Sequence, residues 1–119
     1  MTDMISAEER ELILAKLGQR AVDRMLQFKN YDGSWEIRPE TQASFMKFLG
    51  RVTFRLSVDP SIFLSSDGEL EIAWNDADKK AVQLVFSTEG ILVFHEAVKR
   101  EEMLPHSAYA EVAAEFSHI

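Results

Sequence analysis

The middle of the chain, residues 59–95, alternates apolar and polar positions in a pattern that predicts paired β-strands. Its clearest stretch sets large apolar residues at every second position: Leu70, Ile72 and Trp74. Glu69 and Glu71 flank the first of these, so one face of the strand is apolar and the other is acidic and faces water. Ser66-Asp67-Gly68 precedes the stretch and suits a tight turn, because Asp and Gly tolerate positive φ angles. We predict a β-hairpin over residues 59–74.

Two further strands follow from the same kind of pattern. Residues 81–86 place Val82, Leu84 and Phe86 at alternate positions, and residues 91–94 are all apolar. The segment between them ends in a glycine, which supplies the backbone freedom of a turn. The chain therefore predicts an antiparallel meander of three strands, or four if residues 62–65 pair. Helices should cover one face, because so small a sheet cannot bury enough surface alone.

The first helix is expected to begin at Ser6, whose hydroxyl can accept the Glu9 amide while the Glu9 carboxylate reaches back. Apolar residues then recur at helical spacing as far as Phe28, so one face of this helix should pack on the protein. Gly18 is its weak point, with a cost of up to about 1 kcal/mol relative to alanine.

A second helix is predicted to start at Pro39, which suits the first helical position. Its far end has two interpretations. If the helix stops at Gly50, residues 52–58 alternate well enough to form a strand. If it continues to about Leu56, which is the favoured interpretation, it aligns three basic residues at four-residue spacing. These residues are Lys47, Arg51 and Arg55.

Near the C-terminus, apolar positions at helical spacing predict a short helix after Pro105, ending before residues 117–119, which should fray. The whole pattern predicts an α+β fold in a single domain, residues 1–119. Its parts are two N-terminal helices, a three- to four-stranded antiparallel β-meander and a short C-terminal helix packed on one face.

Composition narrows the classes of function. The 119 residues are 46% hydrophobic and 28% charged, which is ordinary for a globular protein. There is no cysteine, no secretory signal and no run near the ~20 apolar residues of a membrane span, so the expected location is the cytoplasm, away from membranes. The net charge of −7 is opposite to the cationic surface that nucleic-acid binding needs, so nucleic acid is not an expected partner.

Three short segments of the chain carry a shared pattern. They are Asn30-Tyr31-Asp32-Gly33, the Pro-led helix with Phe48-Leu49, and Pro60-Ser61-Ile62-Phe63 continuing through Asp67-Gly68 to Trp74. Together, over about residues 27–96, they resemble a small bacterial family with an N-W-D-G-type loop and a P-S-V-x-P-x-x-D-G hairpin that ends in E-W. Members of that family are common in phages, other mobile elements and operon pairs, and have no established activity. The resemblance implies a small accessory protein rather than a chemistry.

The sequence indicates two candidate contact surfaces for a protein partner. One is the loop that carries Tyr31, Asp32 and Trp35, because aromatic residues of this kind dominate interface hot spots. The same aromatics could instead fold back over the core, which is the favoured interpretation for a short loop. The other surface is the acidic strand face with Glu69 and Glu71.

Motifs for catalysis or cofactor binding are sparse. His95-Glu96 lacks the second histidine of an H-E-x-x-H zinc motif, because position 99 is lysine. The three histidines lie on different predicted elements, so no metal or other cofactor is expected. The chain has neither a G-x-S-x-G elbow nor a glycine-rich phosphate loop, and no catalytic residue is assigned.

The favoured hypothesis is a non-enzymatic, protein-binding accessory protein, encoded by a phage or mobile element, that acts as an inhibitor or neutralising partner of another protein. One alternative is a small enzyme that uses His95 beside Glu96, which requires a cavity with His95 at its wall. The other alternative is nucleic-acid binding through Lys47, Arg51 and Arg55, with a steep dependence on salt.

Overall fold

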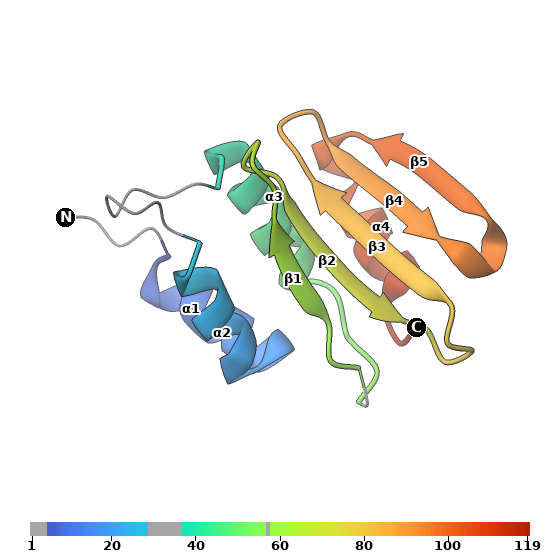
Figure 1. Ribbon diagram of the computed structural model, residues 1–119, viewed down its shortest axis with the longest axis horizontal. Coiled ribbons are helices and arrows are strands. Elements are labelled where there is room, and N and C mark those ends of the chain that lie inside the picture. The colour runs from blue at the N-terminus through green and yellow to red at the C-terminus, as the bar shows by residue number, and fades with distance from the viewer. Residues whose placement is uncertain (1–4, 29–36, 57) are drawn as a thin grey trace.

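The protein consists of helices packed against one antiparallel sheet, in a computed structural model that describes residues 5–28, 37–56 and 58–119 (Figure 1). The helices of the described residues are α1 (Ala7–Leu17), α2 (Gln19–Leu26), α3 (Pro39–Leu49) and α4 (Tyr109–Phe116), with two short 3₁₀ helices, η1 (Glu96–Val98) and η2 (His106–Ala108). The strands are β1 (Ser61–Leu64), β2 (Leu70–Asn75), β3 (Ala81–Phe86), β4 (Ile91–His95) and β5 (Arg100–Leu104). The predicted α+β class is confirmed, with five strands rather than three or four.

The N-terminal helical segment begins as predicted and then divides. The Ser6 hydroxyl accepts the N–H of Glu9, and the Glu9 carboxylate accepts the N–H of Ser6. The prediction of one continuous helix to Phe28 is wrong, because Gly18 has a φ of 93° and separates α1 from α2. The weakest position of the predicted helix is the point where the chain turns.

Helix α3 starts at Pro39, as predicted, and Gly50 caps its C-terminal end. The favoured interpretation of residues 50–58 as more helix is wrong, and the described residues of this segment form no strand either. The ring of Phe54 instead packs edge-on against Trp74, with the ring centroids 5.2 Å apart. The packing of Phe54 against the sheet therefore outweighs the local preference of this segment for a helix.

Consecutive strands pair antiparallel in the order β1-β2-β3-β4-β5. The predicted hairpin over residues 59–74 is confirmed as β1 and β2, with Ile62 opposite Ile72. The second predicted hairpin is confirmed as β3 and β4. Strand β5 escaped prediction because its first three residues are Arg-Glu-Glu, which hide the apolar alternation of a strand.

The β1–β2 and β2–β3 turns share one geometry. In each, a side-chain oxygen of the first residue accepts the backbone N–H groups two and four residues further on, from Ser65 in one turn and Asp76 in the other. The fourth residue has a positive φ, which is 79° at Gly68 and 64° at Lys79. The Asp-Gly turn is thus confirmed, and the next turn repeats it with a lysine in the place of the glycine.

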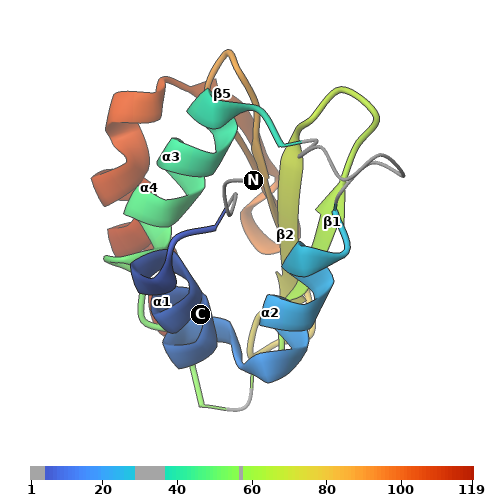
Figure 2. The same cartoon turned by 90° about the vertical axis from the view of Figure 1, so that its left-hand side faces the viewer.

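The hydrophobic core lies between the sheet and the helices, which gather on one side of it (Figure 2). Alternate strand residues face the helices and are buried: Ile62, Leu70, Ile72, Trp74, Val82, Leu84, Phe86, Ile91 and Val93. The ring of Phe86 lies 5.3 Å from that of Phe45 and 5.4 Å from that of Phe48, centroid to centroid. Aromatic pairs at such distances add about 0.5–1.5 kcal/mol beyond the area they bury.

The last residues are held in place, contrary to the expectation that they fray. The indole N–H of Trp74 donates to the backbone oxygen of Ile119 at 2.9 Å, and the N–H of His118 donates to the carbonyl of Thr53 at 2.7 Å. This segment therefore joins β2 to the loop after α3. In the part of the chain that the structure describes, no helix combines the length and the apolar character needed to cross a membrane.

Candidate functional site

One face of the sheet carries no described helix, and we call it the open face (Figures 1 and 2). Its side chains come from the strand positions that alternate with the core positions. The strand register arranges them in two rows across the sheet. The first row is Phe63, Glu71, Val85, Leu92 and Met103, and the second is Ser61, Ala73, Gln83, Phe94 and Glu101.

The open face holds an apolar patch, defined as Val85, Leu92, Phe94 and Met103. Val85 lies directly opposite Leu92, and Leu92 lies opposite Met103. Phe94 follows two residues along β4, so its side chain lies on the same face. Directly opposed side chains have their Cβ atoms about 4.5–5.5 Å apart, so the four form one continuous surface. Met103 is 46% exposed and the other three are half-buried.

The charged side chains of the two rows are both acidic. Glu71 lies between Phe63 and Val85 in the first row, and Glu101 ends the second row beside Phe94. Neither carboxylate forms an ion pair or hydrogen bond with another described residue. An apolar surface with acidic groups and no lysine or arginine in its rows is complementary to a partner that carries basic and apolar groups.

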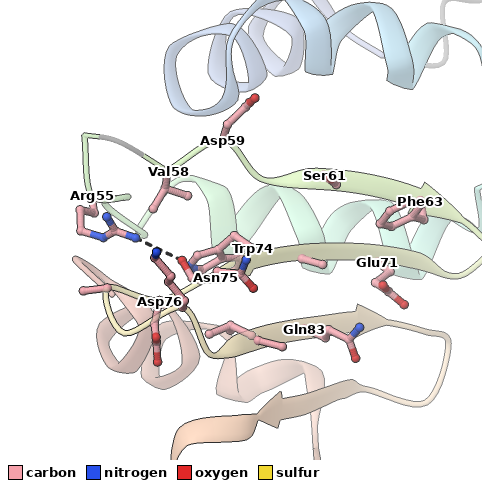
Figure 3. Close-up of a pocket in the computed structure, with 15 residues that line it drawn as sticks. Arg55, Val58, Asp59, Ser61, Phe63, Glu71, Trp74, Asn75, Asp76 and Gln83 are labelled. Carbon is pink, nitrogen blue, oxygen red and sulfur yellow. Dashed lines mark hydrogen bonds between the residues drawn. The ribbon is translucent and has the colours of Figure 1, made fainter.

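A depression of about 720 Å³ continues the open face toward the β2–β3 turn (Figure 3). Phe63, Glu71 and Gln83 line it from three neighbouring strands. Arg55 forms part of another wall, and its guanidinium Nη2 donates to the carbonyl of Asn75 at 3.1 Å. The loop after α3 therefore borders the open face.

Of the predicted contact residues, one lies on the open face and one lies in a turn. Glu71 lies on the open face, as the alternation predicted. Glu69 lies just before β2, in the turn, where its N–H donates to the Ser65 hydroxyl. Tyr31, Asp32 and Trp35 lie outside the described residues, so the loop contact stays a prediction.

The apolar patch was not predicted from the sequence, although a signal for it exists. The run Ile91-Leu92-Val93-Phe94 is apolar at every position, whereas a strand with one wet face alternates. Val85 likewise stands at an outward position among the core residues of β3. Apolar residues at both odd and even positions of a strand indicate that both of its faces make contacts.

His95 lies on the core side, at the end of β4. Its Nε2 atom is 3.0 Å from Oδ2 of Asp76, and both residues are only 7% exposed. This hydrogen bond, with the backbone N–H groups of Lys80 and Asp78, holds the pKa of Asp76 below its usual value, although burial acts in the opposite direction. The pair therefore connects β4 to the β2–β3 turn.

The His95 ring is buried among core side chains. The His95 ring packs edge-on against Phe116, with the centroids 5.6 Å apart. Glu96 makes a separate contact, in which its carboxylate accepts the N–H of Ala81 at 2.9 Å. His95 lines neither the depression on the open face nor a second one of about 480 Å³ between α2 and β1.

The three basic residues do not share one helix face, because α3 ends before two of them. The Nζ of Lys47 lies 5.7 Å and the Cζ of Arg51 5.6 Å from the ring centre of Tyr109, so both cations contact one aromatic ring. Arg55 is directed to the carbonyl of Asn75 at the open face. The expectation of three cations aligned on one helix is wrong.

Among the described residues, no three histidine or carboxylate side chains gather closely enough to hold a metal ion. No model of a protein family matches the chain, and no curated protein or solved structure matches it either. Function therefore has to be inferred from the open face, the His95–Asp76 pair and the sequence pattern.

Proposed function

We propose that this is a non-enzymatic accessory protein that binds another protein through the open face of its sheet. The observation that supports the proposal most is the apolar patch, because its four side chains lie on a face that no described helix covers. Contiguous apolar surface rimmed by polar residues is typical of sites that contact another macromolecule.

The side chains of the open face also have the composition of a protein interface. Phe63, Phe94 and Met103 are large side chains of the types enriched at such interfaces. Glu71 and Glu101 supply charge around the apolar surface, where it contributes to orientation and association rate more than to affinity. The depression beside Arg55 offers space into which one partner side chain can insert.

The proposed mode of action is occupation of a partner's surface, as an inhibitor or neutralising partner. With a net charge of −7, the protein attracts a basic partner over long range, and this raises the association rate. A phage or mobile-element origin is proposed from the sequence resemblance alone. A chain without cysteine is compatible with action in a reducing cytoplasm.

Site-directed photocrosslinking tests the proposal with the full chain. The crosslinking residue p-benzoylphenylalanine replaces Gln83, an exposed residue in the middle of the open face, and in a matched control it replaces Glu111, an exposed residue of α4. Both proteins are irradiated in a lysate of the source cells, and the crosslinked protein is identified by mass spectrometry. We expect capture of a defined protein from position 83 and not from position 111.

Purified components then quantify the contact. Leu92→Arg introduces a charge in the apolar patch, and Glu111→Arg is its control on the helix side. We expect Leu92→Arg to weaken binding at least about thirtyfold, as for a hot-spot residue, with Glu111→Arg close to wild type. Equal capture from both positions, or unchanged affinity of a folded Leu92→Arg protein, contradicts the proposal. The double variant Tyr31→Ala/Trp35→Ala tests the predicted loop contact separately.

A further inference from the structure

The two edges of the sheet differ in what lies beside them. Helix α2 lies beside β1, and Nε of Arg24 donates to the carbonyl of Ile62 at 3.4 Å. Strand β5 forms the opposite edge, and no described element runs along its outer side (Figure 1). Among the described residues, the edge of β5 is therefore the one that stays open to a further strand.

The register shows which backbone groups of β5 point outward. The N–H of Ser87 donates to the carbonyl of Gly90, so these two residues form a hydrogen-bonded pair at the end of the β3–β4 ladder. Hydrogen-bonded and non-hydrogen-bonded pairs alternate along an antiparallel ladder. By this alternation, Leu92 and Phe94 form hydrogen bonds with β3, so the backbone groups of Val93 point toward β5. Val93 lies opposite Glu102, and the N–H and C=O groups of Glu102 therefore point toward β4. Those of Glu101 and Met103 point away from β4.

The side chains on this edge add charge and apolar surface to the free backbone groups. Glu101 is exposed and makes no ion pair with another described residue. Glu102 and Glu115 both pair with the guanidinium of Arg100, whose single positive charge compensates one of the two carboxylates. Met103 is nearly half exposed and belongs to the apolar patch. The edge therefore presents net negative charge, including the carboxylate of Glu101, next to apolar surface.

We propose that the β5 edge accepts an extended segment of the partner protein, with a basic and an apolar residue two positions apart on one side, as a sixth strand of the sheet. This inference rests on the proposed function and specifies the part of the partner that binds. The ladder to Glu101 and Met103 provides backbone hydrogen bonds, and a lysine or arginine of the segment pairs with Glu101. An apolar residue two positions further along lies on the same side, beside Met103, and extends the apolar patch.

A second copy of this chain fits the same edge poorly. Antiparallel self-pairing centred on Glu101 or on Glu102 sets identical carboxylates directly opposite each other, which is unfavourable. Self-pairing centred on Met103 sets Glu101 opposite Pro105, which has no N–H to donate. A basic segment from another protein meets neither obstacle.

Two synthetic peptides test the inference on the full-length protein. The probe is the capped octapeptide Thr-Lys-Thr-Val-Thr-Lys-Thr-Val, which carries its lysines and valines on one side of the strand, and its matched control has glutamate in place of each lysine. We expect the lysine peptide to bind at micromolar to millimolar concentration and to slow the hydrogen exchange of the Glu101 and Met103 amides, measured by NMR. The Glu102 amide should be protected with and without peptide, and the glutamate peptide should not bind.

Edge variants test whether the bound peptide is a strand. Met103→Pro removes an outward N–H and leaves the groups that pair with β4, a position where strands tolerate proline. It should weaken the lysine peptide about tenfold or more, whereas Met103→Ala should stay within about threefold of wild type. If Met103→Pro does not fold, Glu101→Lys replaces it and should reverse the preference between the two peptides. No binding of the lysine peptide to wild type, or equal binding to a folded Met103→Pro protein, overturns the inference.

The crosslinked partner separates this inference from the proposed function. If Leu92→Arg loses the partner and Met103→Pro keeps it, the open face is the binding site and the edge inference fails. If both variants keep the partner, the proposed function fails as well. Loss of the partner in both variants supports both.

Discussion

Gly90 lies so close to Leu104 that no side chain fits between them. A Cβ atom on Gly90 would overlap the carbonyl oxygen of Leu104, and the φ of Gly90 is 154°, which L-residues rarely adopt. We therefore expect Gly90→Ala to lower the free energy of unfolding by about 2 kcal/mol or more, because β4 and β5 must separate to make room. Urea denaturation followed by circular dichroism measures this.

Gly50 supplies the control for that substitution. It has an ordinary helical φ of −66°, and a Cβ there would lie 3.6 Å from the nearest atom, the carbonyl oxygen of Met46. Gly50→Ala should not lower the free energy of unfolding and should raise it by up to about 1 kcal/mol. Equal losses at both glycines would show that the close approach to β5 is not what requires Gly90.

The matching turns predict opposite effects at equivalent positions. Lys79 has the positive φ that Gly68 has in the preceding turn, and this conformation costs an ordinary L-residue roughly 1–2 kcal/mol. Lys79→Gly should therefore raise the urea midpoint, with a gain of up to about 1 kcal/mol after the entropy of glycine is subtracted. Gly68→Ala should lower the free energy of unfolding by about 1 kcal/mol. A destabilised Lys79→Gly protein would contradict the shared turn geometry.

The lowered pKa of Asp76 predicts how stability depends on pH. The unfolded chain protonates this carboxyl near its ordinary pKa of about 3.9, whereas the folded chain does so only at lower pH. The contribution is therefore complete above roughly pH 5 and is lost as the pH falls through the lowered folded pKa. Asp76→Asn should be less stable than wild type at pH 7, and the difference should shrink toward pH 3.

Asp78→Asn is the matched control for the titration. It removes the carboxylate of Asp78, an exposed residue in the same turn. The Asp76 side chain instead accepts hydrogen bonds from two backbone N–H groups and lies against His95. Unfolding curves between pH 3 and pH 7 should be nearly parallel for wild type and Asp78→Asn. A stability difference for Asp76→Asn that grows in acid would contradict the assigned direction of the pKa.

Duplex DNA provides a test of the nucleic-acid alternative. Two of its three basic residues, Lys47 and Arg51, lie over the ring of Tyr109, and the net charge of the chain is −7. We expect no binding of a fluorescent 20-base-pair duplex by anisotropy at about 0.15 M salt, since the field around the protein repels phosphates. Binding that weakens steeply with salt, and that is lost in Lys47→Ala/Arg51→Ala, would favour the alternative over the proposed function.

The strands were predictable where local pattern and turn chemistry agree. In β2 and β3 the alternation marks the core face, and the residues of the β1–β2 turn specify its conformation. Strand β5 could not be recognised, because an edge strand carries charges that resemble those of a loop. The path of residues 50–56 could not be predicted for another reason, since it depends on the contact of Phe54 with Trp74, which lies 20 positions further along the chain.

The candidate site was predictable only in part. Glu71 follows from the alternation of its own strand, but the apolar patch depends on the register of three strands, which local sequence does not determine. His95 and Asp76 are 19 positions apart, and their hydrogen bond exists only because β3 places the end of β4 beside the β2–β3 turn. Sequence spacing therefore indicates which residues share one face of a strand, and the topology of the sheet determines which residues of different strands come into contact.

The unequal edges of the sheet have a consequence for stoichiometry. Filaments that grow by strand addition need two complementary edges on each molecule, so that every unit can accept one neighbour and offer itself to the next. In the part of the chain that the structure describes, α2 and Arg24 lie beside β1, which leaves the edge of β5 for addition. With one open edge on each copy, the chain does not polymerise through its own sheet, and the proposed complex joins one β5 edge to one partner segment.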